Sequence, residues 1–303
     1  MKFSKYFYCG KPLRQVMPEL VADRTTGRSI VFATDTYEYR GDFYRADQPM
    51  IPLLTLSMIF EEILLPRVQK TKEQQQSRTK ARAEVFTPSW ICNKMNNFCD
   101  EDWFQRSGVF NTENDDHTWT VTEDPVSFSG DLAGWERYVD SKRIEITCGE
   151  APYLVSRYDA ATGEPLEIKQ RIGILDRKLR IVNENTSDEK EWLKWAYRAF
   201  EATYGFEYQG DNLFFARVNL VLTFIDYYRD RFGKDPEIGM VKHVANIVSW
   251  NLWQMDGLKD TVPYVTESLL KEENKPVYCR IRDWRSRKVF EYRSMKGEKG
   301  DEI

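Results

Sequence analysis

The spacing of apolar and polar residues changes near residue 143, where a short strand-like run begins. The stretch RIEITCGEAPYLVSRYD (143–159) opens with alternating apolar positions, passes through a Cys-Gly turn and reaches Pro152. Proline is favoured in the first turn of a helix, because its missing N–H needs no partner there. This stretch therefore predicts a strand, a turn and a helix.

The following residues repeat the same order of elements. Helical spacing occurs in residues 171–185 and 188–204, where Trp192, Trp195, Ala196 and Phe200 would face a core. The run YGFE then predicts a strand, followed by a long helix, a further helix and a strand that ends near Asp256. Strands that alternate with helices favour a parallel, Rossmann-like sheet.

The residues before this region predict a long helix of mixed character. It begins near Ser57 and continues to about residue 86, with Leu64, Leu65 and Val68 on an apolar side. Its second half is polar, with the cations Lys70, Lys72, Arg78, Lys80 and Arg82. We interpret it as a solvated helix or linker; the alternative is a positive surface near a phosphate backbone.

The predicted strand ends carry groups suited to a nucleoside. In open parallel sheets, ligands bind at the carboxyl ends of the strands. Gly149 permits close backbone approach at the first end, and Glu207 at the second can accept hydrogen bonds from two ribose hydroxyls. Asp256 at the third can accept a bond from an exocyclic amine.

Composition narrows the class of protein. The 303 residues have a net charge of -4, which does not indicate a nucleic-acid binder, although binding depends on local patches. An aromatic content of 14% argues against disorder. The longest apolar stretch is broken by Pro52, Glu61 and Glu62, so no membrane span is predicted. Five cysteines without a CxxC pair predict no disulfide framework or zinc ribbon, and we expect a cytoplasmic protein.

Four segments resemble the motifs of adenine-N6 DNA methyltransferases, in the same order. EVFTPSWICNKMNN resembles the segment that precedes their catalytic domain, and IEITCGEAPYL is similar to their cofactor loop. YGFEYQGDNLFFARVNL resembles their acidic second motif, and NLWQMDGL their third. The likeness covers roughly residues 60–290. It extends to the modification part of restriction–modification systems, especially type IIG-like methylases and the proteins called restriction endonuclease subunit M.

The resemblance implies a partial Rossmann-like S-adenosylmethionine-dependent methyltransferase sheet, preceded by a mixed, helix-rich N-terminal region. The cofactor would be S-adenosylmethionine. Its methionine end would contact Phe86, Thr87, Pro88, Glu145, Thr147, Cys148 and Gly149, its ribose Glu207, and its adenine amine Asp256. Two residues depart from the family pattern, since Ile146 replaces a proline and Ala151 the second glycine.

The family's catalytic motif, with two adjacent prolines before an aromatic residue, is absent because the chain contains no Pro-Pro pair. The sequence therefore provides no candidate catalytic residue. The expected organisation is an N-terminal region with a helical linker (1–83) and an incomplete methyltransferase domain (84–303) with a β-hairpin at about 276–295. A second polypeptide would supply the catalytic loop and target recognition domain for double-stranded DNA, and the first strand would have an unpaired edge.

Other interpretations stay open. The chain could be a non-catalytic module that binds S-adenosylmethionine or DNA in a regulatory role, or a purely structural protein. A dinucleotide enzyme is disfavoured because no GxGxxG is present. His117 and His243 are far apart and predict no metal site. The expected hairpin is rich in basic residues, which indicate either a solvated surface or a contact with DNA or a partner. These residues are Arg280, Arg282, Arg285, Arg287, Lys288 and Arg293.

Overall fold

The expected parallel strands form a small sheet in the computed structural model of this protein, which describes residues 11–82, 84, 87–128, 134–266 and 276–296. The strand order is β3-β4-β5, and both neighbouring pairs are parallel. These strands are β3 (Arg143–Glu145), β4 (Thr203–Glu207) and β5 (Leu252–Gln254). The mixed α/β class is confirmed, while the assignment of this three-stranded sheet to a Rossmann-like domain stays a prediction.

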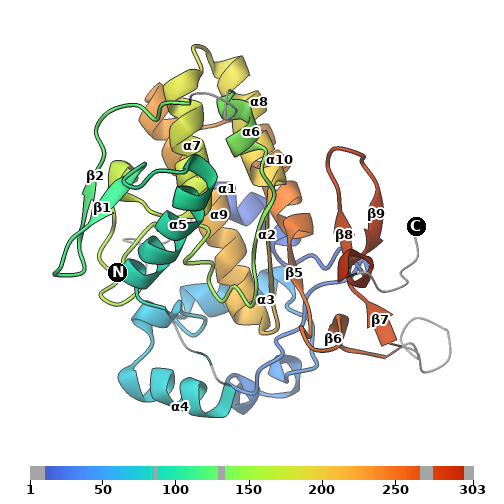
Figure 1. Ribbon diagram of the computed structural model, residues 1–303. Coiled ribbons are helices and arrows are strands. Elements are labelled where there is room, and N and C mark those ends of the chain that lie inside the picture. The colour runs from blue at the N-terminus through green and yellow to red at the C-terminus, as the bar shows by residue number, and fades with distance from the viewer. Residues whose placement is uncertain (1–10, 83, 85–86, 129–133, 267–275, 297–303) are drawn as a thin grey trace.

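Helices dominate the architecture (Figure 1). The α-helices are α1 (Lys11–Gln15), α2 (Met17–Leu20), α3 (Pro52–Phe60), α4 (Lys72–Arg82), α5 (Ser89–Phe104), α6 (Trp135–Val139), α7 (Ile174–Asn185), α8 (Glu189–Glu201), α9 (Gly210–Phe232) and α10 (Ile238–Asn251). Short 3₁₀ helices are η2 (Glu38–Arg40), η3 (Asp42–Tyr44), η4 (Arg67–Gln69), η6 (Ile168–Gln170) and η8 (Tyr292–Lys296). Antiparallel pairs join β1 (Asn111–Glu113) to β2 (Trp119–Val121), β6 (Thr261–Thr266) to β7 (Pro276–Tyr278), and β8 (Arg280–Arg282) to β9 (Val289–Glu291).

Helix α9 runs through the middle of the molecule (Figure 1). Almost every residue from Gly210 to Tyr228 is buried, and buried polar residues such as Arg217 and Asn219 are hydrogen-bonded to backbone carbonyls of other segments. It packs against α10, α7 and the strands β4 and β5. The helix ends at Phe232, and the next residue, Gly233, has a φ of +63°, the left-handed conformation that glycine adopts readily.

The helices expected within 171–185 and 188–204 are confirmed as α7 and α8. The Asp188 carboxylate caps α8 by accepting a hydrogen bond from the Glu191 N–H at 2.8 Å. Trp192 and Phe200 are buried in the core, as their spacing predicts. Trp195 is only partly buried, and its ring packs edge-on against another tryptophan at the surface of α6.

Residues on both sides of the boundary expected at residue 83 share one hydrophobic core. Leu13, Leu20 and Met58, from the first three helices, belong to the same buried cluster as the apolar residues of α9 and α10. Helix α2 also packs directly against α10. The N-terminal helices are therefore integral to the packing around the sheet.

A second, smaller hydrophobic cluster covers one face of the sheet. Tyr204, Phe206 and Trp253 project from β4 and β5 on this face and pack with Ile281 and Tyr292. The C-terminal strands that contribute to this cluster lie on the opposite side of the helical body from the β1–β2 hairpin (Figure 1). The β8–β9 pair occupies the stretch in which the sequence predicts a hairpin.

The helix expected from Ser57 to residue 86 is not continuous, and this prediction was wrong. Helix α3 ends at Phe60, and α4 begins only at Lys72. Pro66 lies between them, and its ring cannot continue a helix because it lacks an N–H and collides with the preceding turn. The chain can therefore fold back on itself between the two helices.

The helix expected to begin at Pro152 is also absent. Residues 152–154 form a turn, and the next helix is α7. Hydrogen bonds to residues outside the segment pair its backbone groups. The Tyr153 carbonyl accepts from the Asn96 side chain at 3.0 Å and from the Ile174 N–H at 2.8 Å. Backbone groups that find such partners do not need a helix.

The expectations about membrane spans and about cysteines can be compared with the described residues. None of the helices in the described ranges combines the length and apolar character needed to cross a lipid bilayer. Four cysteines lie in these ranges as free thiols, namely Cys92, Cys99, Cys148 and Cys279. Cys9 lies outside the described residues.

Candidate functional site

The carboxyl ends of the three parallel strands lie side by side. The Cys148 N–H donates to the Phe206 carbonyl at 2.8 Å, which joins the loop after β3 to β4. The Gly149 N–H donates to the Glu207 carboxylate, also at 2.8 Å. The Met255 N–H donates to the Glu207 carbonyl at 3.0 Å, which joins β5 to the same place. The three strand ends predicted to share a site are therefore neighbours.

The loop after β3 has an unusual backbone. Thr147, Gly149 and Ala151 have φ values of +51°, +54° and +65°, so alternate residues are left-handed. A non-glycine residue pays roughly 1 kcal/mol or more in this conformation, and such strain is concentrated at functional sites. Gly205 in β4 makes room for the loop, because a Cβ there would lie 3.3 Å from the Cys148 Cβ.

Glu145, the last residue of β3, is buried beneath this loop. Burial raises the pKa of its carboxyl well above the usual range, and the nearby Glu207 carboxylate raises it further. Backbone N–H groups of Tyr153 and Leu154 partly oppose this rise. One oxygen, Oε2, has no hydrogen-bond partner among the described residues. A buried acceptor without a donor requires an explanation, because leaving one unpaired is costly.

Glu207, the last residue of β4, binds backbone groups on both sides. Its Oε2 accepts from Gly149, and its Oε1 accepts from the Gln209 N–H at 3.0 Å. Burial raises the pKa of this carboxyl, while these N–H groups lower it. Each carboxylate oxygen can accept more than one hydrogen bond, so Glu207 retains capacity for a ligand hydroxyl.

Asp256 lies at the carboxyl end of β5, directly after Met255, whose N–H bonds to Glu207. Its Oδ1 accepts from the Leu258 N–H at 3.0 Å and caps the following turn. Its Oδ2 lies 3.4 Å from the Lys259 ammonium, which is largely exposed. The carboxylate is therefore partly engaged in the structure of its own loop.

The segment predicted to contact the methionine end is described only in part. Phe86 lies outside the described residues, and Pro88 immediately precedes helix α5. The Thr87 side chain hydrogen bonds with Tyr153, which belongs to the segment that covers Glu145. Thr87 therefore lies near the segment that covers Glu145, while its role at a cofactor stays a prediction.

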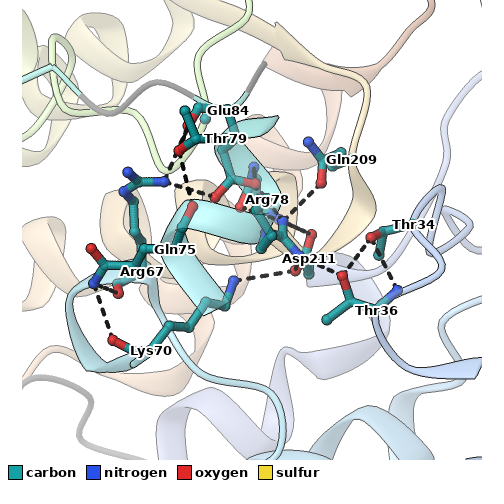
Figure 2. Close-up of polar contacts among 12 residues, drawn as sticks. Thr34, Thr36, Arg67, Lys70, Gln75, Arg78, Thr79, Glu84, Gln209 and Asp211 are labelled. Carbon is teal, nitrogen blue, oxygen red and sulfur yellow. Dashed lines mark hydrogen bonds and ion pairs between the residues drawn. The ribbon is translucent and has the colours of Figure 1, made fainter. Parts of the chain in front are cut away.

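A buried network of charges lies beside these strand ends (Figure 2). Arg78 of α4 donates to Glu84 at 2.7 Å and to Gln209 at 2.8 Å. Its Nη1 also lies 2.8 Å from the carboxylate of Asp211, in the first turn of α9. The Lys70 ammonium lies 3.4 Å from the same carboxylate. The network therefore fixes α4 against the turn that follows β4.

This network corrects the prediction of a solvated polar helix for two residues. Lys70 is 8% exposed and Arg78 is 4% exposed, so neither forms a surface for a phosphate backbone. Burial alone would raise the pKa of Asp211, but the Arg78 and Lys70 cations outweigh it and hold that pKa well below the usual range. The sequence signal is weak, since it consists only of the polar run QGDN at the start of α9.

Glu150, next to Gly149, is a further buried acid that the sequence did not indicate. Its Oε1 accepts from the Arg67 N–H at 2.7 Å, and its Oε2 accepts from the Tyr158 hydroxyl at 3.0 Å. Burial raises the pKa of this carboxyl to about 7, although the Lys70 cation acts in the opposite direction. Glu150 thus joins the loop to the segment before α4.

Three buried acids therefore surround the loop, and burial raises the pKa of each. They are Glu145, Glu150 and Glu207. A cationic group that enters this environment would favour the ionised carboxylates and lower their pKa values.

The other candidate groups lie elsewhere or are bound within the fold. No cluster that could hold a metal ion occurs in the described ranges. The His117 ring stacks on Trp90 at 4.1 Å, and the His243 ring lies 4.4 Å from that of Tyr197. These contacts agree with structural roles for both histidines.

The basic residues of the C-terminal hairpin are partly engaged in contacts with the rest of the fold and with the hairpin itself. Arg285 forms an ion pair with Asp140, and Arg293 pairs with Glu291 at 2.6 Å. The Arg282 guanidinium lies 4.5 Å from the centre of a tryptophan ring in the same hairpin. Ion pairs and ring contacts thus account for part of its positive charge.

Comparisons with protein-family models, with curated proteins and with solved structures find no match to this chain. The interpretation of the site therefore depends on its geometry and on the sequence motifs.

Proposed function

We propose that this chain is the S-adenosylmethionine-binding portion of a DNA adenine-N6 methyltransferase in a restriction–modification system. The observation that carries the proposal is the buried, unpartnered Oε2 of Glu145 beneath the left-handed loop. This oxygen lacks a hydrogen-bond donor, and the ammonium group of a methionine moiety has three N–H donors and a positive charge. An ammonium group could therefore supply the donor that Glu145 Oε2 lacks.

The carboxyl ends of the other strands support the same assignment. Glu145 and the loop residues Thr147, Cys148 and Gly149 would hold the methionine end, together with Thr87 and Pro88 from the neighbouring segment. Glu207 would accept hydrogen bonds from the ribose hydroxyls, and Asp256 would accept from the adenine amine. The raised pKa values around the loop also favour a ligand with net positive charge.

The cofactor would supply an activated methyl group when bound. This chain's residues would bind and orient it, and would exclude water from the Glu145 side. We propose that a second polypeptide supplies the catalytic loop and the target recognition domain, because the sequence contains no Pro-Pro motif. The complex would act on adenine in double-stranded DNA, with the base turned out of the helix.

Titration calorimetry of the full chain with S-adenosylmethionine tests this proposal. We expect saturable binding, and we expect Glu145→Gln and Glu207→Gln each to weaken it by about tenfold or more, equivalent to about 1.4 kcal/mol. Glu101→Gln is the matched control, because Glu101 is exposed on α5 and distant in sequence from the loop. Urea unfolding of each variant separates lost binding from lost folding.

The proposal would be refuted by equal binding of the wild type and both site variants, or by equal binding of NAD. A methyl-transfer assay with labelled cofactor addresses the second polypeptide. The chain alone should transfer no label to DNA, so transfer by residues 1–303 alone would contradict the split arrangement. Cofactor binding that persists without any transfer in the assembled complex would favour the alternative of a regulatory binding module.

A further inference from the structure

A cavity of about 550 Å³ lies between the β1–β2 hairpin and the helices α7 and α9. Pockets that bind small molecules commonly have volumes of about 300–1,000 Å³. The Trp119 side chain ties the hairpin to η6, because its Nε1 donates to the Gln170 carbonyl at 3.0 Å. Among the described residues, none that is assigned to the strand-end site lines this cavity. The cavity is therefore a separate candidate site.

Arg171, between η6 and α7, lines the cavity and has an incompletely paired guanidinium. Its Nη2 donates to the Asp226 carboxylate at 2.7 Å, and its Nε donates to the Leu166 carbonyl at 3.4 Å. The third nitrogen, Nη1, is buried and has no hydrogen-bond partner within the described ranges. The side chain is 7% exposed. A buried donor without an acceptor is costly, so Nη1 requires a partner.

Asp176, in the first turn of α7, also lines the cavity and has an incompletely paired carboxylate. Its Oδ2 accepts from the Ser156 N–H at 2.8 Å and from the Gly173 N–H at 3.2 Å. Its Oδ1 is buried and has no partner in the part of the chain that the structure describes. Burial raises the pKa of this carboxyl, and the nearby Arg171 cation opposes the rise. An unpaired acceptor and an unpaired donor therefore belong to neighbouring side chains at the cavity.

Three aromatic residues from different segments line the same cavity, namely Phe110, Trp119 and Tyr227. The Tyr227 hydroxyl donates to the Asp176 main-chain carbonyl at 3.1 Å, which holds the ring beside that residue. The Arg171 guanidinium lies 5.8 Å from the centre of the same ring. A flat heterocycle suits this combination, because its face can pack on aromatic rings while its edge supplies both a donor and an acceptor.

The exposed charges of the lining are mainly acidic. Three acids, Glu123, Glu167 and Asp230, are exposed, against one exposed cation, Lys169. The deeper cations Arg177 and Arg180 already form ion pairs within the fold. A phosphate group at the mouth of the cavity would therefore meet an excess of negative charge, which disfavours nucleotides and nucleic-acid backbones. An uncharged ligand avoids this repulsion.

We propose that this cavity binds the base of an uncharged nucleoside, through an edge on which an N–H donor lies next to an acceptor. The N–H would donate to Asp176 Oδ1, and the adjacent acceptor would receive a hydrogen bond from Arg171 Nη1. Adenine and cytosine have such a pair in their amine and ring nitrogen, and uracil has one in its ring N–H and carbonyl. The inference goes beyond the proposed function and does not depend on it, because the two sites use different residues.

Titration calorimetry of the full chain with matched nucleosides tests the proposal. Cytidine is compared with pyrimidin-2-one riboside and adenosine with purine riboside, since each second compound lacks only the amine. Uridine is compared with 3-methyluridine, which lacks the ring N–H. We expect the preferred parent nucleoside to bind at least tenfold more tightly than its counterpart. Its monophosphate should bind less tightly at low salt, and the difference should decrease as salt screens the acids.

Protein variants assign the binding to this cavity. Asp230→Trp places a large ring at the mouth from an exposed position on α9 and should weaken nucleoside binding at least tenfold. Glu237→Trp is the matched control, because this exposed acid does not line the cavity, and it should leave binding unchanged. Asp176→Asn should reduce the preference for the parent nucleoside, since its oxygen is needed by the Ser156 and Gly173 N–H groups and its amide would replace Oδ1. Circular dichroism confirms folding, and Asp230→Trp keeps the test decisive if Asp176→Asn does not fold.

Three results would overturn the proposal: no nucleoside binds, each parent binds no better than its counterpart, or Asp230→Trp leaves the binding unchanged. Adenosine is part of S-adenosylmethionine, so its titration is repeated with Glu207→Gln. Adenosine binding that Glu207→Gln removes and Asp230→Trp preserves belongs to the strand ends and counts against the cavity. Nucleoside binding at the cavity without any S-adenosylmethionine binding would support this inference and remove the proposed function.

Discussion

Replacing Glu150 by glutamine should make the protein more stable at alkaline pH. Glu150 is 2% exposed, and burial raises the pKa of its carboxyl from an ordinary value of 4.5 to about 7. The folded state therefore holds a proton that the unfolded state releases between these two pH values. Stability from this group is complete below the unfolded pKa and is lost as pH rises through about 7.

The size of the effect follows from the difference between the two pKa values. Each pH unit of difference corresponds to about 1.4 kcal/mol, so the rise from 4.5 to about 7 corresponds to about 3 kcal/mol. Glutamine has nearly the same shape and is neutral at every pH. Its oxygen can still accept from the Arg67 N–H, and its amide can donate to the Tyr158 hydroxyl oxygen.

Urea unfolding from pH 5 to pH 9 measures this prediction directly. The free energy of unfolding of Glu150→Gln, minus that of the wild type, should increase by about 3 kcal/mol across this range. Other buried acids with raised pKa values, such as Glu207, affect both proteins equally and cancel in the difference. Exposed Glu101→Gln should show no such trend. A difference that is independent of pH, or that increasingly favours the wild type, would refute the reasoning.

Two other predictions concern the packing around the site. Asp211→Asn should lower the free energy of unfolding by about 3–5 kcal/mol, because it leaves the buried Arg78 and Lys70 cations without their carboxylate; Asp47→Asn, in an exposed pair with Arg45, should cost less than about 1 kcal/mol. Similar urea midpoints for these two variants would contradict the importance of the network. Gly210→Ala should destabilise the fold by about 2–4 kcal/mol, since its Cβ would lie 2.0 Å from the Val31 carbonyl oxygen. Gly239→Ala has no atom within 4 Å of the new Cβ and should instead stabilise α10 by about 0.5–1 kcal/mol; thermal unfolding of both variants should show opposite shifts, and shifts of the same sign would contradict this.

Elements defined by local periodicity could be predicted from the sequence. The helices α7 and α8 have apolar spacing that determines both their type and their buried side, whereas β4 and α9 are buried on nearly all sides. The parallel order of the sheet followed, because each strand is separated from the next by helices. Local spacing was sufficient for the helices, since they form most of their backbone hydrogen bonds internally.

The turn after Pro152 could not be predicted, because its hydrogen bonds depend on distant residues. Asn96 binds the carbonyls of both Tyr153 and Ile172, which are 57 and 76 positions away in the sequence. Pro152 favoured the start of a helix, but the Asn96 side chain donates hydrogen bonds to these carbonyls, so they do not need helical partners. The left-handed backbone at Ala151 was equally hidden, since alanine does not indicate a positive φ.

The same limitation applies to the buried charges, and it bears on the candidate site. Arg78 and Asp211 are separated by 133 positions, so no local pattern indicates that they pair. In the folded protein the nearby cations bind Asp211 and Glu84, whereas Glu145 and Glu207 have backbone N–H groups as their nearest donors. The fold therefore neutralises the acids beside α4 and leaves those at the loop uncompensated. A ligand with its own positive charge would pair with the acids at the loop, Glu145 and Glu207. This difference between the two sets of acids is the physical reason to test a cationic cofactor before a neutral or anionic one.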